Sequence, residues 1–257
     1  MKRQITIVAA IMALMLVPVI CSGQAKIYTK KARLEDFTSR TTKVVAGGLS
    51  PMAIDIQNEI RSRWHVSPYE ICAIEDYEAA RSDNGLYFLR LVQEEGVMFL
   101  SLSKGGQENA ADMKARPFEV VRIPVSSSDG SSIDGFAFTG AFVDMVQRFA
   151  QDAMESDLIG YAGLKSTGSR KLDGKAVVLD PEKARKAMLE GYPGTLAGIV
   201  VAPSFVSFKT KCYKMLIDCE SHELFWYSES PYLSPSDAAF NEKDIKTITK
   251  RHGVIAE

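Results

Sequence analysis

Residues 175–194, KAVVLDPEKARKAMLEGYPG, contain the local signals from which the fold can be predicted. The apolar run at 176–179, with two β-branched valines, is typical of a strand, and Asp180 followed by Pro181 is the order expected where a helix begins. An aspartate side chain accepts hydrogen bonds from free backbone amides of the first turn, and proline at the first helical position loses no intrahelical bond. Gly191 then ends the helix. The stretch therefore predicts a strand followed directly by an amphipathic helix.

The same order of signals occurs earlier, in residues 43–64, KVVAGGLSPMAIDIQNEIRSRW. Here Ser50 is the predicted helix cap and Pro51 the first helical residue. Apolar residues then recur every three or four positions, which indicates one buried stripe consisting of Ala53, Ile56, Ile60 and Trp64. Each strand-helix unit is followed by further strands, and the first half contains a predicted hairpin with arms at 86–92 and 97–102.

Together these patterns predict an α+β fold in which helices are packed on mixed sheets. The two halves have the same order of elements, which suggests two related lobes, although no repeat is visible residue by residue. A long amphipathic helix within residues 140–161 joins them. We expect an N-terminal α+β lobe at 24–135, and the central helix with a C-terminal α+β lobe at 136–257, or one continuous domain.

The first 23 residues have the character of a secretory signal peptide. Lys2 and Arg3 precede an apolar run from 5 to 20, and small residues follow it. The run is shorter than the roughly 20 residues of a membrane-spanning helix, so we expect cleavage that leaves no transmembrane segment. A lipoprotein signal at Cys21 is disfavoured, because such signals have leucine three residues before the cysteine and Pro18 stands there. We predict a periplasmic or secreted protein.

The mature chain would begin near Gln24 and be mildly acidic. The full chain has 31 basic and 32 acidic residues, and loss of the two basic residues of the signal leaves 29 against 32, a net charge of −3. Proteins that bind nucleic acids concentrate Lys and Arg on one face, so this balance argues against a nucleic-acid partner. With 46% hydrophobic residues, the chain can bury a sizeable core.

Export permits disulfides, and three cysteines remain after the signal: Cys72, Cys212 and Cys219. Cys212 and Cys219 are seven residues apart, so on one extended strand their Cα atoms would lie roughly 23 Å apart, far beyond the reach of a disulfide. A Cys72–Cys212 disulfide is possible if the fold brings the two strands together. The odd count leaves at least one thiol without a partner in the chain.

Near the C-terminus, the stretch CYKMLIDCESHELFWY combines possible metal ligands with aromatic residues. Two β-rich arms surround CESH, so we predict a hairpin between 213–218 and 223–228 in which Asp218 accepts hydrogen bonds from the turn. Cys219 and His222 have a spacing found in metal sites, but structural zinc needs four ligands and usually a second close pair. We therefore predict no metal site here, and no pattern in the sequence indicates a cofactor.

The segments WHVSPYE (Trp64–Glu70), SKGG, CYKMLID, HELFWY and the closing FNEKDIKTI together resemble a family of uncharacterised secreted proteins of the Bacteroidetes. WHVSPYE is the most specific of them, and the resemblance covers nearly the whole mature chain. It implies a bacterial exported location and one continuous architecture. It implies no activity, ligand or catalytic residue.

The sequence contains no nucleophile motif of the G-x-S-x-G type. We expect an exported, non-enzymatic cell-envelope protein that binds a partner protein or a surface. Its binding residues are predicted at the aromatic end of the last hairpin, namely Trp226, Tyr227 and Tyr232. Trp226 and Tyr227 point to opposite faces of a strand, so at least one of them should be exposed. The alternative is a hydrolase that acts on an envelope polymer through a pair of carboxylates.

Overall fold

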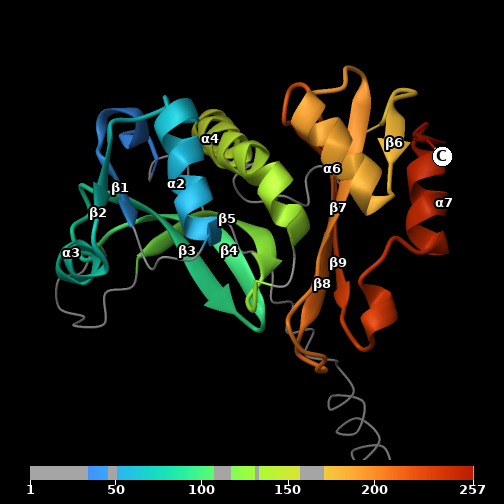
Figure 1. The fold of residues 1–257 in the computed structure, drawn as a ribbon. Coiled ribbons are helices and arrows are strands. Elements are labelled where there is room, and N and C mark those ends of the chain that lie inside the picture. Colours follow the sequence, from blue (N-terminus) through green and yellow to red (C-terminus); the bar gives the residue numbers. More distant parts are fainter. Residues whose placement is uncertain (1–33, 46–50, 107–116, 131–132, 157–170, 257) are drawn as a thin grey trace, which may run out of the picture.

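The computed structural model describes residues 34–45, 51–106, 117–130, 133–156 and 171–256. They form two five-stranded sheets with helices packed on them, and the two lobes lie side by side (Figure 1). The predicted α+β class is therefore confirmed. The predicted signal peptide and the helix cap at Ser50 lie outside the described residues. Within the described ranges, no helix has both the length and the apolar character needed to cross a membrane.

The N-terminal sheet has the strand order β2-β1-β3-β4-β5. Its strands are β1 (Thr42–Val45), β2 (Tyr69–Cys72), β3 (Tyr87–Glu94), β4 (Val97–Lys104) and β5 (Phe118–Ser127). Strand β1 pairs in parallel with both β2 and β3, and β3, β4 and β5 form an antiparallel meander. The helical elements of this lobe are η2 (Phe37–Ser39), α2 (Pro51–Arg63) and α3 (Ile74–Ala80).

The C-terminal sheet has the strand order β10-β6-β7-β8-β9. Its strands are β6 (Ala176–Val178), β7 (Thr195–Val201), β8 (Lys211–Asp218), β9 (Leu224–Pro231) and β10 (Val254–Ala256). Strand β6 pairs in parallel with β10 and β7, and the remaining pairs are antiparallel. The helical elements are α6 (Pro181–Glu190), η5 (Pro235–Asp237) and α7 (Glu242–Lys250).

The two sheets share one pattern of strand directions. In each sheet three neighbouring strands run in parallel, and two antiparallel strands complete it. The middle parallel strand of each lobe leads into a helix that begins with proline, Pro51 of α2 and Pro181 of α6. The edge strands differ, because β2 follows α2 directly whereas β10 is the last strand of the chain. The similarity of the two lobes is thus one of topology.

Helix α6 begins and ends where the local sequence predicts. Asp180 Oδ1 accepts a hydrogen bond from the Lys183 amide at 2.9 Å, and Pro181 is the first helical residue. Gly191 ends the helix with a φ of 64°. Glycine adopts this left-handed conformation without the steric cost that a Cβ atom imposes. The predicted cap, proline and stop signal are all confirmed.

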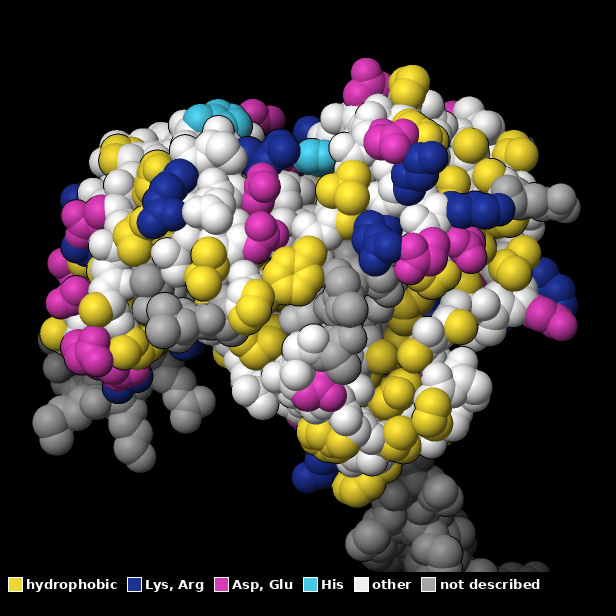
Figure 2. Space-filling view, in the orientation of Figure 1, with side chains coloured by type: hydrophobic (Ala, Val, Ile, Leu, Met, Phe, Trp, Pro, Cys, Tyr) yellow, Lys and Arg dark blue, Asp and Glu magenta, His cyan; other side chains and the backbone are white. Residues whose placement is uncertain are grey.

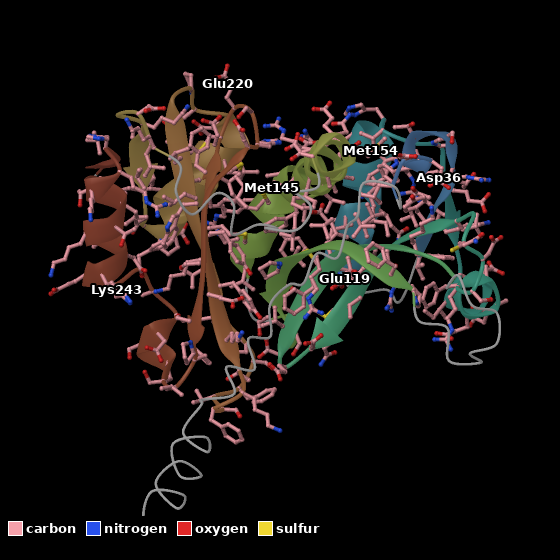
Figure 3. The ribbon with its side chains drawn as sticks, turned by 180° about the vertical axis from the view of Figure 1, so that it is seen from behind. Asp36, Glu119, Met145, Met154, Glu220 and Lys243 are labelled. Carbon is pink, nitrogen blue, oxygen red and sulfur yellow. The ribbon has the colours of Figure 1, made fainter. Side chains whose placement is uncertain are left out.

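The central helix is α4 (Thr139–Glu155), which follows the 3-10 helix η3 (Ile133–Phe138). It lies between the two lobes in Figure 1 and packs on α2 and β5. Figure 3 shows Met145 on the part of α4 nearer to the C-terminal lobe and Met154 near its far end. Buried side chains of α4 belong to one hydrophobic core that includes residues of both lobes. The two sheets are therefore joined by a shared core.

The segment Trp64–Glu70 forms the corner between α2 and β2. Trp64 is buried, and its Nε1 donates a hydrogen bond to Ser67 Oγ at 3.1 Å. The same hydroxyl lies 2.8 Å from the Thr42 hydroxyl of β1. The Thr42 amide donates to the Pro68 carbonyl oxygen at 2.8 Å. These contacts hold the helix against the sheet, so the segment has a structural role here.

Candidate functional site

The structure buries all three predicted binding residues. Trp226 and Tyr227 are each 5% exposed, and Tyr232 is 8% exposed. The expectation that Trp226 or Tyr227 would remain at the surface is wrong, because the C-terminal sheet is covered on both faces. Residues of α7 pack on the Trp226 face, whereas α6 and the N-terminal lobe cover the Tyr227 face.

Tyr227 belongs to an aromatic cluster at the junction between the lobes. Its ring centroid lies 6.4 Å from that of Tyr213, which lies 5.5 Å from the Phe99 ring of the N-terminal lobe. The Tyr227 hydroxyl is buried and has no hydrogen-bond partner among the described residues. Burial raises the pKa of Tyr227 well above its usual value, and the negative charge of Glu229 adds to the shift. The cluster holds the lobes together and leaves no aromatic surface there.

A different group of apolar residues is exposed at one end of the C-terminal sheet. This group, the apolar tip, consists of Phe205, Val206 and Phe208 in the loop between β7 and β8, and Leu233 after β9. Phe208 is 82% exposed, Leu233 62% and Phe205 53%. Figure 2 shows hydrophobic side chains gathered at the lower end of this lobe. Single exposed apolar residues are common on protein surfaces, but several together are typical of an interaction site.

Hydrogen bonds within the loop define the shape of the apolar tip. The Ser207 amide donates to Thr210 Oγ1 at 3.0 Å, and the Thr210 hydroxyl lies 2.9 Å from the Ser207 carbonyl oxygen. The Tyr232 amide donates to the Thr210 carbonyl oxygen at 2.9 Å, which brings the neighbouring Leu233 close to the loop. The aromatic side chains therefore project from an ordered turn.

The N-terminal lobe contacts the loop of the apolar tip through Gly96, which lies in the turn between β3 and β4. The Gly96 carbonyl oxygen accepts hydrogen bonds from the Ser204 amide and the Ser128 amide, both at 2.9 Å. Gly96 has a φ of 82°, and a Cβ atom there would lie 3.0 Å from the Phe205 ring and from the Ser204 nitrogen. Because both the conformation and the close contact require glycine, the two lobes fix the tip together.

A lysine and a carboxylate lie beside the apolar tip, and Asp237 Oδ2 accepts a hydrogen bond from the Leu233 amide at 2.9 Å. Lys209 Nζ lies 5.6 Å from the ring centroid of Phe208. The next basic residue, Lys211, forms an ion pair with Glu229 at 3.3 Å, so its charge is balanced. Sequence reasoning missed this surface because the stretch PSFVSFKT has no helical or strand period. Apolar residues in a stretch between two predicted strands were the only available signal.

The predicted hairpin of β8 and β9 is confirmed, with antiparallel pairing across its two arms. Asp218 is 3% exposed, and its carboxylate accepts a hydrogen bond from the Ser221 amide in the turn at 2.8 Å. Cys219 is buried beside it, and burial raises the pKa of its thiol to about 11. A thiol with so high a pKa is protonated at neutral pH and is a poor nucleophile. The turn is a structural element.

His222 follows the turn and contacts the N-terminal lobe. Its Nδ1 lies 2.7 Å from Asp144 Oδ2 of α4, and Arg63 Nη1 of α2 donates to the same oxygen at 3.1 Å. Burial alone would raise the pKa of Asp144, but the hydrogen bond with His222 and the charge of Arg63 outweigh it and lower the pKa. His222 thus joins the two lobes. Within the described ranges, no three His, Cys, Asp or Glu side chains gather as metal ligands would.

Glu119 is a partly buried carboxylate on β5 of the N-terminal sheet and is labelled in Figure 3. Burial raises the pKa of Glu119, although the charge of Arg122 and the hydrogen bond from Ser101 Oγ, at 2.9 Å, act in the opposite direction. Arg122 Nη1 also donates to Glu94 at 2.7 Å. One guanidinium therefore lies beside both carboxylates, an arrangement that stabilises charge on the surface of the sheet.

The suggested Cys72–Cys212 disulfide is not formed, and both residues are buried free thiols. Cys72 ends β2, at the edge of the N-terminal sheet that is remote from the C-terminal lobe (Figure 1). Cys212 lies on β8 in the other sheet, where burial raises the pKa of its thiol to about 11. The strand order keeps the two cysteines apart, because β1, β3, β4 and β5 lie between β2 and the other lobe.

The described residues thus expose several large apolar side chains together at the apolar tip, and they bury the aromatic residues that the sequence indicated. Comparison of the chain with protein-family models, curated proteins and solved structures found no match.

Proposed function

We propose that this protein is an exported, non-enzymatic component of the bacterial cell envelope that binds a partner protein through the apolar tip. The observation that carries the proposal is the exposure of Phe205 and Phe208, on a loop that both lobes hold in place, and of Leu233 beside that loop. Binding energy at protein interfaces is concentrated in a few side chains, often aromatic ones. Export is supported by the sequence of residues 1–23 and by the resemblance to secreted proteins.

A partner with an apolar pocket would gain most from Phe208. Burying a phenylalanine side chain contributes about 1.5–3 kcal/mol, which corresponds to a factor of roughly 10 to 100 in affinity. Phe208 still exposes 82% of its surface, so nearly all of this contribution is left for binding. The backbone of the loop is already held by Ser204 and Thr210. A loop ordered before binding loses little further conformational entropy when it docks.

Replacement of Phe208 by serine tests the proposal. In cells that produce the full chain, crosslinking followed by mass spectrometry should identify a reproducible envelope protein, and Phe208→Ser should remove that crosslink. The purified partner should bind the variant at least tenfold more weakly. Leu189→Ser is the matched control, because Leu189 is 70% exposed but lies on α6, away from the loop between β7 and β8 (Figure 1). Equal affinity for the wild type and Phe208→Ser would contradict the proposal.

A hydrolase is the second candidate, and the environment of Glu119 favours it. The Glu119 side chain is 31% exposed, and its raised pKa means that it retains a proton at higher pH than usual, which suits a general acid. Turnover of an envelope glycan or peptide that disappears in Glu119→Gln, without any captured partner, would support this candidate against the binding function. Glu94→Gln is the matched control, because Glu94 contacts the same arginine and its side chain is 49% exposed.

A further inference from the structure

Basic residues gather on the outward side of helix α7. Ile248 is fully buried in the core of the C-terminal lobe and defines the inward side of the helix. An α-helix turns by about 100° per residue, so Lys243, Lys246 and Lys250 project within about 60° of one another, opposite Ile248. All three lysines are exposed, and Figure 3 shows Lys243 near one end of the helix. The outward side of α7 is therefore a row of lysines.

The positive charge on this side of α7 is only partly balanced. Asp244 is largely buried, and its Oδ2 lies 2.6 Å from Lys214 Nζ, so its charge is taken up on the inward side. Glu242 lies 3.5 Å from Lys246, but both side chains are largely exposed, so water and salt screen the pair. The outward residues, which we call the basic face of α7, have a net charge of +3 from four basic groups and one carboxylate: Glu242, Lys243, Lys246, Thr247, Lys250 and Arg251.

Helix α6 of the same lobe also exposes basic residues, but acidic residues accompany them. Arg185 forms an ion pair with Glu182 on that helix. The outward residues of α6 have a net charge of only +1 from three basic and two acidic groups: Glu182, Lys183, Arg185, Lys186 and Glu190. The whole chain has a formal net charge of −1. Unbalanced positive charge therefore gathers on α7, at the edge of the C-terminal lobe that is remote from the N-terminal lobe (Figure 1).

The form of the basic face indicates which kind of anion it fits. Lys243 and Lys250 lie roughly 10 Å apart along the helix axis, so the charges are spread along a line and do not converge on one small ligand. The described residues of the face include no aromatic side chain, whereas protein interfaces are enriched in aromatic residues and depleted in lysine. A basic residue close to an anionic membrane strengthens binding roughly fivefold. We propose that the basic face of α7 attaches the protein to the surface of a membrane that contains anionic phospholipids.

Co-sedimentation with lipid vesicles tests the attachment. Protein purified from the cells that produce it should bind vesicles of phosphatidylglycerol and phosphatidylcholine in equal amounts at least tenfold more strongly than vesicles of phosphatidylcholine alone. This difference should disappear as the salt concentration rises from about 0.1 M to about 1 M, because the screening length falls from about 10 Å to about 3 Å. Combined replacement of the three lysines, Lys243→Gln, Lys246→Gln and Lys250→Gln, should weaken binding to the anionic vesicles at least tenfold.

Two controls separate the basic face from net charge and from the apolar tip. Lys183→Gln, Arg185→Gln and Lys186→Gln together remove the same charge from α6, and this variant should bind the anionic vesicles as the wild type does. Phe208→Ser should do the same, because Phe208 is not part of α7. Equal binding of the wild type to both kinds of vesicle, an equal loss in the α6 variant, or loss of binding in Phe208→Ser would each overturn the proposal. The first comparison needs no variant, and its failure would leave the protein partner of the apolar tip untouched.

Discussion

Asp218 closes the hairpin turn that carries His222 to the N-terminal lobe, and its replacement should destabilise the protein strongly. Its side chain is 3% exposed. The carboxylate accepts hydrogen bonds from the Ser221 amide at 2.8 Å, the Glu220 amide at 3.2 Å and Lys175 Nζ at 2.8 Å. Asp218→Ala removes both carboxylate oxygens that accept these three hydrogen bonds and leaves the donors in a largely buried place.

The size of the effect follows from these contacts. Hydrogen bonds to a charged group contribute about 1.5–3 kcal/mol each, and they are not additive when they share one carboxylate. The contribution of the Lys175 pair is discounted, because the lysine side chain is 27% exposed and water screens it. We expect Asp218→Ala to lower the free energy of unfolding by about 3–5 kcal/mol. Asp218→Asn keeps one oxygen acceptor, so its loss should be about half as large.

The effect should depend on pH. Burial alone would raise the pKa of Asp218, but the hydrogen bonds from Lys175 and Ser221 outweigh it and lower the pKa. A group whose pKa is lower in the folded state contributes stability above its unfolded pKa, about 3.9 for aspartate. That contribution is lost as the pH falls through the folded pKa. The difference in unfolding free energy between the wild type and Asp218→Asn should therefore be largest at neutral pH and narrow below about pH 4.

Chemical denaturation followed by circular dichroism, at pH 7 and at pH 3, measures both effects. Glu220→Gln is the matched control, because Glu220 is the exposed neighbour in the same turn (Figure 3) and should change stability by no more than about 0.5 kcal/mol. A loss below about 1 kcal/mol for Asp218→Ala at pH 7 would refute the reasoning, since that is less than one charged hydrogen bond. The reasoning would also be refuted if the difference in unfolding free energy between the wild type and Asp218→Asn stayed constant from pH 7 to pH 3.

Three further predictions concern other parts of the structure. Gly96→Ala should cost about 1–3 kcal/mol of unfolding free energy, because its φ is positive and the added Cβ would meet Phe205; Gly130→Ala, with a positive φ but open space around it, should cost less, and equal losses would rule out the contact with Phe205 as the cause. Thiol titration of the chain that begins at Gln24 should detect three thiols after denaturation and scarcely any in the native protein at pH 8, because all three are buried; a single thiol after denaturation would show a disulfide. Tyr227→Phe should leave the unfolding free energy unchanged or raise it by up to about 1 kcal/mol, because the hydroxyl that it removes is buried without a partner among the described residues. A clear loss of unfolding free energy in calorimetry would show that the hydroxyl has a hydrogen-bond partner.

Features that depend on a few neighbouring residues could be predicted from the sequence. Asp180 and Pro181 begin α6 and Gly191 ends it, as the order of these three residues indicates. The turn after Asp218 is predictable in the same way, because the Asp218 carboxylate accepts a hydrogen bond from the Ser221 amide only three residues later. Such contacts form within one turn of the chain, so the sequence pattern contains all their participants.

Burial of the aromatic hairpin could not be predicted in the same way. The alternation of a strand correctly places Trp226 and Tyr227 on opposite faces. It does not say what covers each face, and here α7 covers one while α6 and the N-terminal lobe cover the other. The exposed aromatic surface therefore lies at Phe205 and Phe208, in a loop whose residues have no periodic pattern.

The sequence by itself determined the strand-helix unit that ends at Gly191, with its cap at Asp180, and the hairpins β3–β4 and β8–β9, because these arise from interactions over a few residues. Only the tertiary structure decided which residues meet across the lobes. His222 contacts Asp144 over 78 residues, and Arg63 reaches the same carboxylate over 81. Contacts at such separations depend on how the two sheets pack around their shared core, and no local pattern records that packing.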